Sequence, residues 1–231
     1  MLHRDLRPTM RLAPCREPSV ARLDWPAHAA PGMMNRRLAF VSHSRGPPME
    51  FPQKHGPWQI LARETVYRDP WLQVDRDQVI RPDGNPGTHC IVHLLRGISV
   101  LAVDGAGMAY LTEDFHYGVG RTTVEVVSGG IEDDESALQA AQRELREELG
   151  ITAASWTDLG SCDPFTTIVV SPTQLFLARE LTFGATDLEG SERTRTKKLP
   201  FDTVVAMVAD GRITHAPSCL LILKTREILG R

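Results

Sequence analysis

The sequence has no excess of positive charge and no long apolar run, and each absence excludes a class of protein. Its 26 lysines and arginines face 29 aspartates and glutamates, which gives a formal net charge of −3. Without surplus cations to displace phosphate counterions, we expect no binding to nucleic acid. Because no run of about 18 apolar residues is present, we also expect no segment that spans a membrane.

Cysteines are scarce and widely spaced. The four are Cys15, Cys90, Cys162 and Cys219. No two of them form a Cys-x-x-Cys pair, so free thiols in a reducing compartment are the favoured interpretation. The apolar stretch after Arg36-Arg37 is too short for a signal sequence, and no small-residue cleavage site follows it. We therefore expect a cytoplasmic protein.

Residues 1–55 differ in composition from the rest of the chain. They are rich in Arg, Pro, His and Met and show no sustained period of 2 or 3.6 residues. Such a segment cannot bury a core, so we expect a disordered leader over 1–55 and one folded domain over 56–231. Met33, Met34 and Met49 leave a downstream translation start open.

From Trp58 onward, short β-type segments alternate with turns. They predict N-terminal strands within residues 58–82, which end at the turn Arg81-Pro82-Asp83-Gly84, and a core over 88–231. The long apolar stretch from Cys90 to Val103 is followed by a hairpin signal across Asp104–Gly107. Another strand is expected over 122–127, ending at a glycine pair that supplies backbone freedom.

The period then changes to that of a helix. An apolar stripe recurs at helical spacing between Ser136 and Leu149, and Gly150 stands where a glycine ends a helix. The stripe consists of Leu138, Ala141, Leu145 and Leu149. Further strands are expected at 156–159, 168–170 and 174–178, and a last amphipathic helix at 201–209. Strands before and after helices, without regular βαβ alternation, predict an α+β fold built as an α/β/α sandwich on a mixed sheet.

Glu144, Glu147 and Glu148 stand at positions i, i+3 and i+4, so their carboxylates share one side of the expected helix. Like charges at that spacing repel, and the helix gains nothing from them unless a cation lies between. Clustered carboxylate oxygens suit Mg²⁺, with Mn²⁺ as an alternative. A solvated acidic face is the ordinary explanation of three glutamates alone, so the surrounding residues decide between the two.

These glutamates belong to a longer spaced pattern. Gly129 is followed after five residues by Glu135, and after seven more by Arg143-Glu144-Leu145; Glu147-Glu148 and Gly150-Ile151 then follow at one-residue intervals. This pattern resembles the Nudix box at every defining position. With seven positions restricted to one residue type, chance agreement is roughly 10⁻⁹ per starting point.

The resemblance implies a Nudix hydrolase, which is a Mg²⁺-dependent enzyme with the Nudix-type sandwich that cleaves a pyrophosphate. Glu144 and Glu148 are then the principal side-chain metal ligands, Glu147 shares a second ion, and the Ser128 carbonyl is a backbone ligand. The structural positions of the box are Gly129, Glu135, Arg143 and Gly150. In this family the metals neutralise a diphosphate and lower the pKa of a bound water.

From Ile60 to Ile228 the chain resembles the ADP-ribose and nucleotide-sugar pyrophosphatase branch. The segments Val66–Leu72, Glu125–Glu132 and Asp210–Thr214 are typical of that branch. The resemblance implies a nucleoside diphosphate joined to a small moiety as substrate. It also implies a late loop acid that helps position water or metal, for which Glu192, or less well Glu189, is the candidate. Finally, it implies a homodimer with an N-terminal β-hairpin, Tyr67 to Ile80, that completes the partner's site.

Three departures from the branch weaken the case for ADP-ribose itself and leave the metal chemistry intact. Asp114-Phe115-His116 replaces a Gln-Tyr-Arg whose Arg reaches substrate, Ile168-Val169 replaces an expected acid, and Thr214–Pro217 replaces an acid-alanine pair. His116 is a weak substrate-binding candidate, as are Tyr67 and Trp71, for which strand packing is at least as good an explanation.

Two other functions remain open. One is a nucleoside triphosphate house-cleaning pyrophosphohydrolase, and the other is a nucleotide-binding Nudix module without catalysis. Such modules usually lose box glutamates, and here all of them are present. His89 and His93 share one face of their segment, but without a third ligand we favour core histidines over a metal site.

Overall fold

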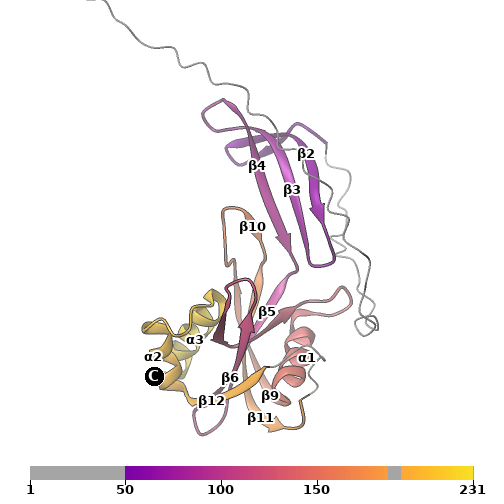
Figure 1. The fold of residues 1–231 in the computed structure, drawn as a ribbon. Coiled ribbons are helices and arrows are strands. Elements are labelled where there is room, and N and C mark those ends of the chain that lie inside the picture. The colour runs from indigo at the N-terminus through magenta and orange to yellow at the C-terminus, as the bar shows by residue number, and fades with distance from the viewer. Residues whose placement is uncertain (1–49, 187–193, 231) are drawn as a thin grey trace, which may run out of the picture. The chain divides into compact units, whose positions relative to one another are not determined.

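The computed structural model describes residues 50–186 and 194–230, and within them the chain forms two β-sheets and three helices (Figure 1). The first sheet has the order β1-β2-β3-β4-β10. Its strands are β1 (Gln53–His55), β2 (Trp58–Arg68), β3 (Leu72–Ile80), β4 (Pro86–Leu94) and β10 (Val169–Val170). The first four are antiparallel neighbours, and β10 joins parallel to β4.

The turn predicted at Arg81-Pro82-Asp83-Gly84 is confirmed, and a second turn lies between β2 and β3. Asp69 closes the β2–β3 connection, because its Oδ1 accepts hydrogen bonds from the Trp71 and Leu72 amides, both at 2.8 Å. After β3, the Gly84 amide donates to the Arg81 carbonyl, and Gly84 has a φ of +81°. The extension is larger than the expected hairpin, since β4 also belongs to it. Its first strand, β1, lies inside the segment expected as leader; residues 1–49 lie outside the described residues.

The second sheet has the order β12-β6-β5-β11-β9, with β7 pairing with β6 and β8 pairing with β5. Its strands are β5 (Gly97–Val103), β6 (Met108–His116), β7 (Arg121–Glu125), β8 (Val127–Gly130), β9 (Ile151–Cys162), β11 (Thr173–Phe183) and β12 (Arg195–Pro200). β5 and β11 run parallel whereas the other pairs are antiparallel, so the sheet is mixed as predicted.

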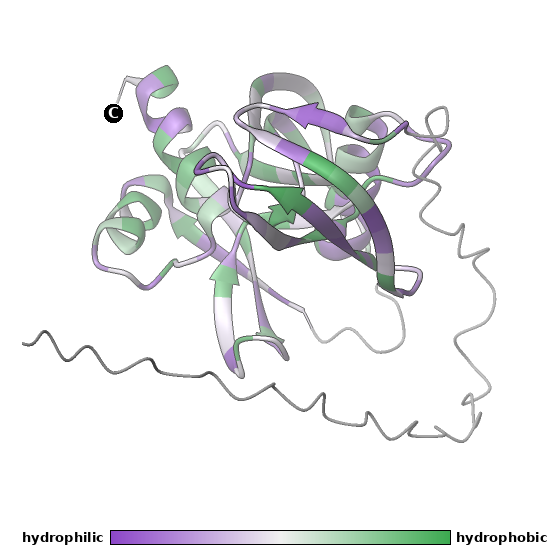
Figure 2. Ribbon diagram, turned by 90° about the horizontal axis from the view of Figure 1, so that it is seen from above, coloured by the Kyte–Doolittle hydropathy of each residue, from purple (hydrophilic) through white to green (hydrophobic). Residues whose placement is uncertain are grey.

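Helices cover both faces of the second sheet. They are α1 (Ala137–Leu149), α2 (Phe201–Ala209) and α3 (Ala216–Leu229). Alternate side chains of β5 face opposite sides of the sheet. Ile98, Val100 and Ala102 pack in the hydrophobic cluster that contains α1. Leu101 and Val103 pack in the cluster that contains α2 and α3. Polar and apolar stretches alternate along the strands in Figure 2. The predicted α/β/α sandwich is confirmed. None of the helices in the described part of the chain is long and apolar enough to cross a membrane.

α1 begins and ends where the sequence predicts. Ser136 is its N-cap in a capping box with Gln139, and Gly150 ends it in the left-handed region at φ +63°. Ala141, Leu145 and Leu149 of the predicted stripe are buried. The prediction that Leu138 belongs to the buried stripe was wrong. Leu138 is 38% exposed, and Ala140 is buried in its place.

Two apolar segments are divided where the sequence gives little sign of it. The stretch from Cys90 to Val103 breaks after Leu94, so that β4 lies in the first sheet and β5 in the second. The strand expected over 122–127 breaks at Val126, where the chain passes from β7 to β8. At each break the chain leaves one strand pairing and enters another, since β4 pairs with β3 but β5 with β11, and β7 pairs with β6 but β8 with β5.

Candidate active site

The end of β8 lies directly against α1. A Cβ added at Gly129 would be 2.7 Å from Glu144 Cγ, closer than real side chains approach. Any larger residue at this position would have to displace the Glu144 side chain or the end of β8, since that side chain occupies the space beside the backbone. β8 is itself fixed by pairing with β5, in which Ser99 faces Ser128 and Ile98 faces Gly129. The structure thus brings Ser128-Gly129 and Glu144 together, as the box resemblance implies.

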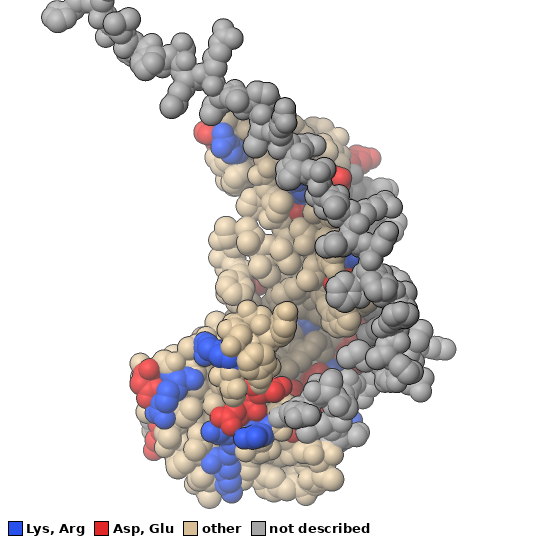
Figure 3. Space-filling model, in the orientation of Figure 1, with Lys and Arg blue, Asp and Glu red and all other residues tan. Residues whose placement is uncertain are grey.

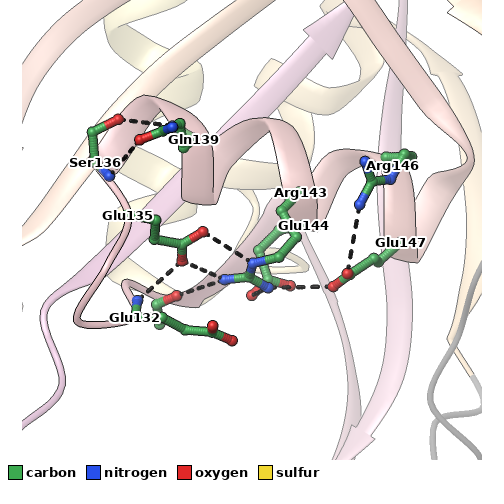
Figure 4. A network of polar contacts seen from close by, with 9 residues as sticks. Glu132, Glu135, Ser136, Gln139, Arg143, Glu144, Arg146 and Glu147 are labelled. Carbon is green, nitrogen blue, oxygen red and sulfur yellow. Dashed lines mark hydrogen bonds and ion pairs between the residues drawn. The ribbon is translucent and has the colours of Figure 1, made fainter. Parts of the chain in front are cut away.

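Arg143 joins the β8–α1 loop to the helix and to two of the glutamates (Figure 4). Its Nη2 donates to Glu135 Oε1 at 2.7 Å and to the Gly130 carbonyl at 3.0 Å. Its Nε donates to Glu135 Oε2 at 3.2 Å, which completes a bidentate pair. Its Nη1 donates to Glu144 Oε1 at 2.7 Å and to Glu147 Oε2 at 3.2 Å. One guanidinium therefore orients both the loop and the carboxylates.

Arg143 is a shared partner of three carboxylates in this network. Each of the four side chains is less than one-fifth exposed. The hydrogen bond to Glu135 raises the pKa of Arg143 above its ordinary value, against the effect of burial, and Glu144 adds to the rise. Arg146 also approaches this network, with its Nη2 3.8 Å from Glu147 Oε1 and its side chain 57% exposed. Clustered carboxylates in a partly buried place favour binding of cations.

The donor chemistry fits a hard divalent cation. Glu144, Glu147 and Glu148 stand at positions i, i+3 and i+4 of α1, and the backbone of β8 at Gly129 lies against the Glu144 side chain. Mg²⁺ is commonly held by one or two carboxylates, with waters and substrate phosphates completing its shell. Within residues 50–186 and 194–230, no group of three or more His, Cys, Asp or Glu side chains is placed to hold a metal ion by itself. A divalent cation at this place would therefore depend on water and substrate oxygens as further ligands.

Other residues singled out from the sequence make contacts with residues other than these glutamates. Tyr67 and Trp71 are at the β2–β3 turn, 53% and 61% exposed, and the Tyr67 hydroxyl donates to Asp69. His116 ends β6, with Nε2 3.4 Å from Glu125 Oε1. Glu192 and its alternative Glu189 lie outside the described residues.

A separate pocket of 490 Å³ lies on the first sheet and was missed by the sequence analysis. Trp58 of β2 and His89 of β4 line it, with ring centroids 5.7 Å apart, and residues 166–170 close one side. Asp77, which is 2% exposed and held by Arg63 in a bidentate pair, also faces it. His89 is thus half-buried in a pocket, with Nε2 3.3 Å from the Thr167 carbonyl, so the expectation of a core histidine was wrong for this residue.

The pocket contains no glutamate of the α1 cluster. The two features are therefore distinct within one chain. On the face drawn in Figure 3, acidic and basic side chains gather over the part that contains the second sheet. Exposed apolar side chains of the first sheet include Leu61, Val66, Tyr67 and Trp71.

Two family descriptions match consecutive parts of the chain. Residues 58–92 match the nucleoside diphosphate sugar hydrolase N-terminal domain, and residues 93–197 match the NUDIX domain. The boundary between the two matches lies within β4, the last long strand of the first sheet. The two matched regions therefore correspond closely to the two sheets.

Curated relatives and a solved structure agree with these matches. The chain is 25% identical over 175 residues to an ADP-ribose pyrophosphatase of Bacillus subtilis (strain 168), which covers 74% of this chain and 95% of that protein. It is 28% identical over 107 residues to an ADP-ribose pyrophosphatase of Mycobacterium tuberculosis (strain ATCC 25618 / H37Rv), covering 46% and 52%. The crystal structure of an ADP compounds hydrolase has the same fold, with a TM-score of 0.65 and 23% identity over 79% of this chain and 97% of that one.

Proposed function

Because this chain belongs to the Nudix hydrolase superfamily, we propose that it hydrolyses the pyrophosphate of a nucleoside diphosphate joined to a small moiety, giving two monophosphates. The observation that carries the proposal is the Arg143 network, in which one guanidinium holds the box loop and two box glutamates together. ADP-ribose or a nucleotide sugar is the proposed substrate type. The description of the N-terminal match and the names of both curated relatives support that choice.

Roles within the site follow from position and chemistry. Glu144 and Glu148 would hold Mg²⁺, or Mn²⁺ in its place, with the Ser128 carbonyl, and Glu147 would share a second ion. A bound divalent ion supplies charge neutralisation of the diphosphate and a lower pKa for an attacking water. Arg143 and Glu135 act as positioning residues, because their bidentate pair fixes the loop that carries Ser128-Gly129. Glu192 remains the proposed loop acid.

The pocket on the first sheet is the proposed place for the nucleobase. Its volume of 490 Å³ lies in the range of small-molecule sites, and Trp58 offers an aromatic face for stacking. Asp77 at the wall provides fixed hydrogen-bond acceptors. Since no box glutamate lines this pocket, the base and the scissile pyrophosphate need not be bound by the same chain.

We accordingly propose a homodimer in which the strands from Tyr67 to Ile80 help complete the partner's substrate site. Val66, Tyr67 and Trp71 are each more than 40% exposed, and a two-fold contact would bury them. The proposed compartment is the cytoplasm, where the thiols of Cys90, Cys162 and Cys219, which are free in the structure, would stay reduced.

A product assay tests the proposal. The full chain is incubated with Mg²⁺ and, separately, with ADP-ribose, a set of nucleotide sugars and the nucleoside triphosphates, and the products are separated by ion-exchange chromatography. We expect a nucleoside monophosphate and a sugar phosphate from one of the first two classes. Release of inorganic pyrophosphate from a triphosphate, with the diphosphate compounds intact, would instead establish a house-cleaning hydrolase. Saturable binding without turnover would establish a non-catalytic module.

A further inference from the structure

The strand that leads to the glutamate cluster changes its neighbour at Val126. Up to Glu125 it belongs to β7 and pairs with β6, where Thr112 faces Glu125. From Val127 it belongs to β8 and pairs with β5, where Val100 faces Val127. Val126 lies between the two ladders and is 1% exposed. We call this change of neighbouring strand at Val126 the crossing. It leaves the backbone groups of Val126 without regular strand partners.

Side chains take the place of the missing ladder at this crossing. The Val126 amide donates to Ser218 Oγ at 3.1 Å, although the two residues are 92 positions apart. Thr112 Oγ1 donates to the Glu125 carbonyl, and Ser128 Oγ donates to the Val126 carbonyl, both at 3.3 Å. Ser218 is fully buried in the first turn of α3. Removing its hydroxyl would therefore leave a buried amide unsatisfied.

His215 attaches the start of α3 to the same crossing. It is the N-cap residue, and its Nδ1 lies 2.9 Å from Ser218 Oγ and 3.1 Å from Glu125 Oε2. Glu125 is also held by Thr123 Oγ1 at 2.6 Å and lies beside His116. One helix end thus contacts both the side chain of Glu125 and the backbone of the next residue.

The crossing is only two residues from the proposed metal ligand. Ser128 follows Val126, with its hydroxyl 2.8 Å from Ser99 Oγ, and Gly129 then lies against Glu144. Two extended residues span about 7 Å, so the Ser128 carbonyl lies close to Val126, and Val127 and Ser128, which follow it, are held by pairing with β5. Val127 packs in the hydrophobic cluster that contains α1, and Val126 packs in the one that contains α3, so helices on both faces of the sheet contact this strand.

We propose that Ser218 and His215 are positioning residues for the metal centre, which hold the Glu125–Val126 crossing and thereby fix the Ser128 carbonyl relative to Glu144. The inference rests on the proposed function, since it takes Ser128 and Glu144 as metal ligands. Substitution of residues that hold metal ligands in position without binding the metal typically lowers metal affinity by about 10- to 100-fold. Ser218 would act in this way without touching either the metal or the substrate.

The test measures Mn²⁺ binding to the metal-free full chain by electron paramagnetic resonance, with no substrate present. Ser218→Ala is expected to raise the Kd for Mn²⁺ by about 10-fold or more. Thr225→Val is the matched control, because Thr225 is also fully buried on α3 but its hydroxyl has no hydrogen-bond partner. This control should bind Mn²⁺ as the parent chain does. Melting temperatures of both variants separate a loss of folding from a loss of affinity.

His215→Gln provides a second variant at a half-buried position, where folding is expected to survive. It should also weaken Mn²⁺ binding. If Ser218→Ala does not fold, the Mn²⁺ affinity of His215→Gln tests the positioning role instead. Parent-like Mn²⁺ affinity in a folded Ser218→Ala protein, or in His215→Gln when Ser218→Ala is unfolded, would overturn the inference. A parent chain that binds no Mn²⁺ and hydrolyses nothing would instead overturn the proposed function, so the two failures are distinguishable.

Discussion

Gly129 and Glu144 are packed so closely that a Cβ on the glycine would lie 2.7 Å from Glu144 Cγ. Gly129→Ala must therefore displace the glutamate or the end of β8. We expect Mn²⁺ affinity to fall by about 10- to 100-fold, measured by direct titration. Gly105→Ala is the control, because no atom lies within 4 Å of the place its Cβ would take and its φ is not positive. Equal affinities of the two variants would mean that this contact does not serve a metal.

Much of this arrangement was predictable because its signals are local. The helix from Ser136 to Leu149 and its three glutamates follow from spacing along 14 residues, and both ends are marked by capping residues. Gly129 was recognised through the box, and the structure adds the steric reason for it. The error at Leu138 arose because helical spacing alone does not determine which of two nearby apolar residues, Leu138 or Ala140, faces the sheet.

The rest depends on contacts between distant segments. Ser218 meets Val126, and His215 meets Glu125, across about 90 residues, and no periodicity connects them. The break after Leu94 lies inside a continuous apolar stretch, so strand assignment alone could not divide it between two sheets. Trp58 and His89 form one pocket only because β2 and β4 flank the same strand.

Removal of the first 48 residues should leave the protein intact. A chain starting at Met49 keeps every strand from β1 onward, and the composition of the deleted part cannot build a core. We expect its melting temperature and its specific activity to match those of the full chain. A clear drop in either quantity would mean that the leader contributes contacts to the domain.

The shared-site dimer predicts a two-chain mass in solution. Sedimentation equilibrium at micromolar concentration should give about twice the 25.6 kDa chain mass, because the proposed two-fold contact would bury exposed apolar side chains of the first sheet. Trp71→Glu should shift the equilibrium toward the single chain and lower activity together with it. A fully active species at the mass of one chain would exclude a site completed by the partner.

Stability should depend on pH through His215. Burial lowers the pKa of its imidazole below the ordinary value of 6.5; Glu125 opposes this shift and His116 adds to it. The unfolded chain then takes up a proton near pH 6.5 while the folded chain resists it, so stability is present above that pH and is lost as pH falls through the folded pKa. The melting temperature should drop less steeply below pH 6.5 in His215→Gln than in the parent. If the melting temperatures of the two proteins fall equally with pH, His215 does not contribute to the pH dependence of stability.

The central claim is that the glutamates of α1 perform a metal-dependent pyrophosphate cleavage. The most direct measurement is kcat at saturating Mg²⁺ for Glu144→Gln and Glu148→Gln, with the substrate identified by the product assay. Glu227→Gln, on an exposed part of α3, is the control. Loss of a metal ligand costs about 3 kcal/mol in the transition state, so the account predicts that kcat falls at least about 100-fold in both variants with melting temperature unchanged. Near-parent turnover by either variant would contradict it.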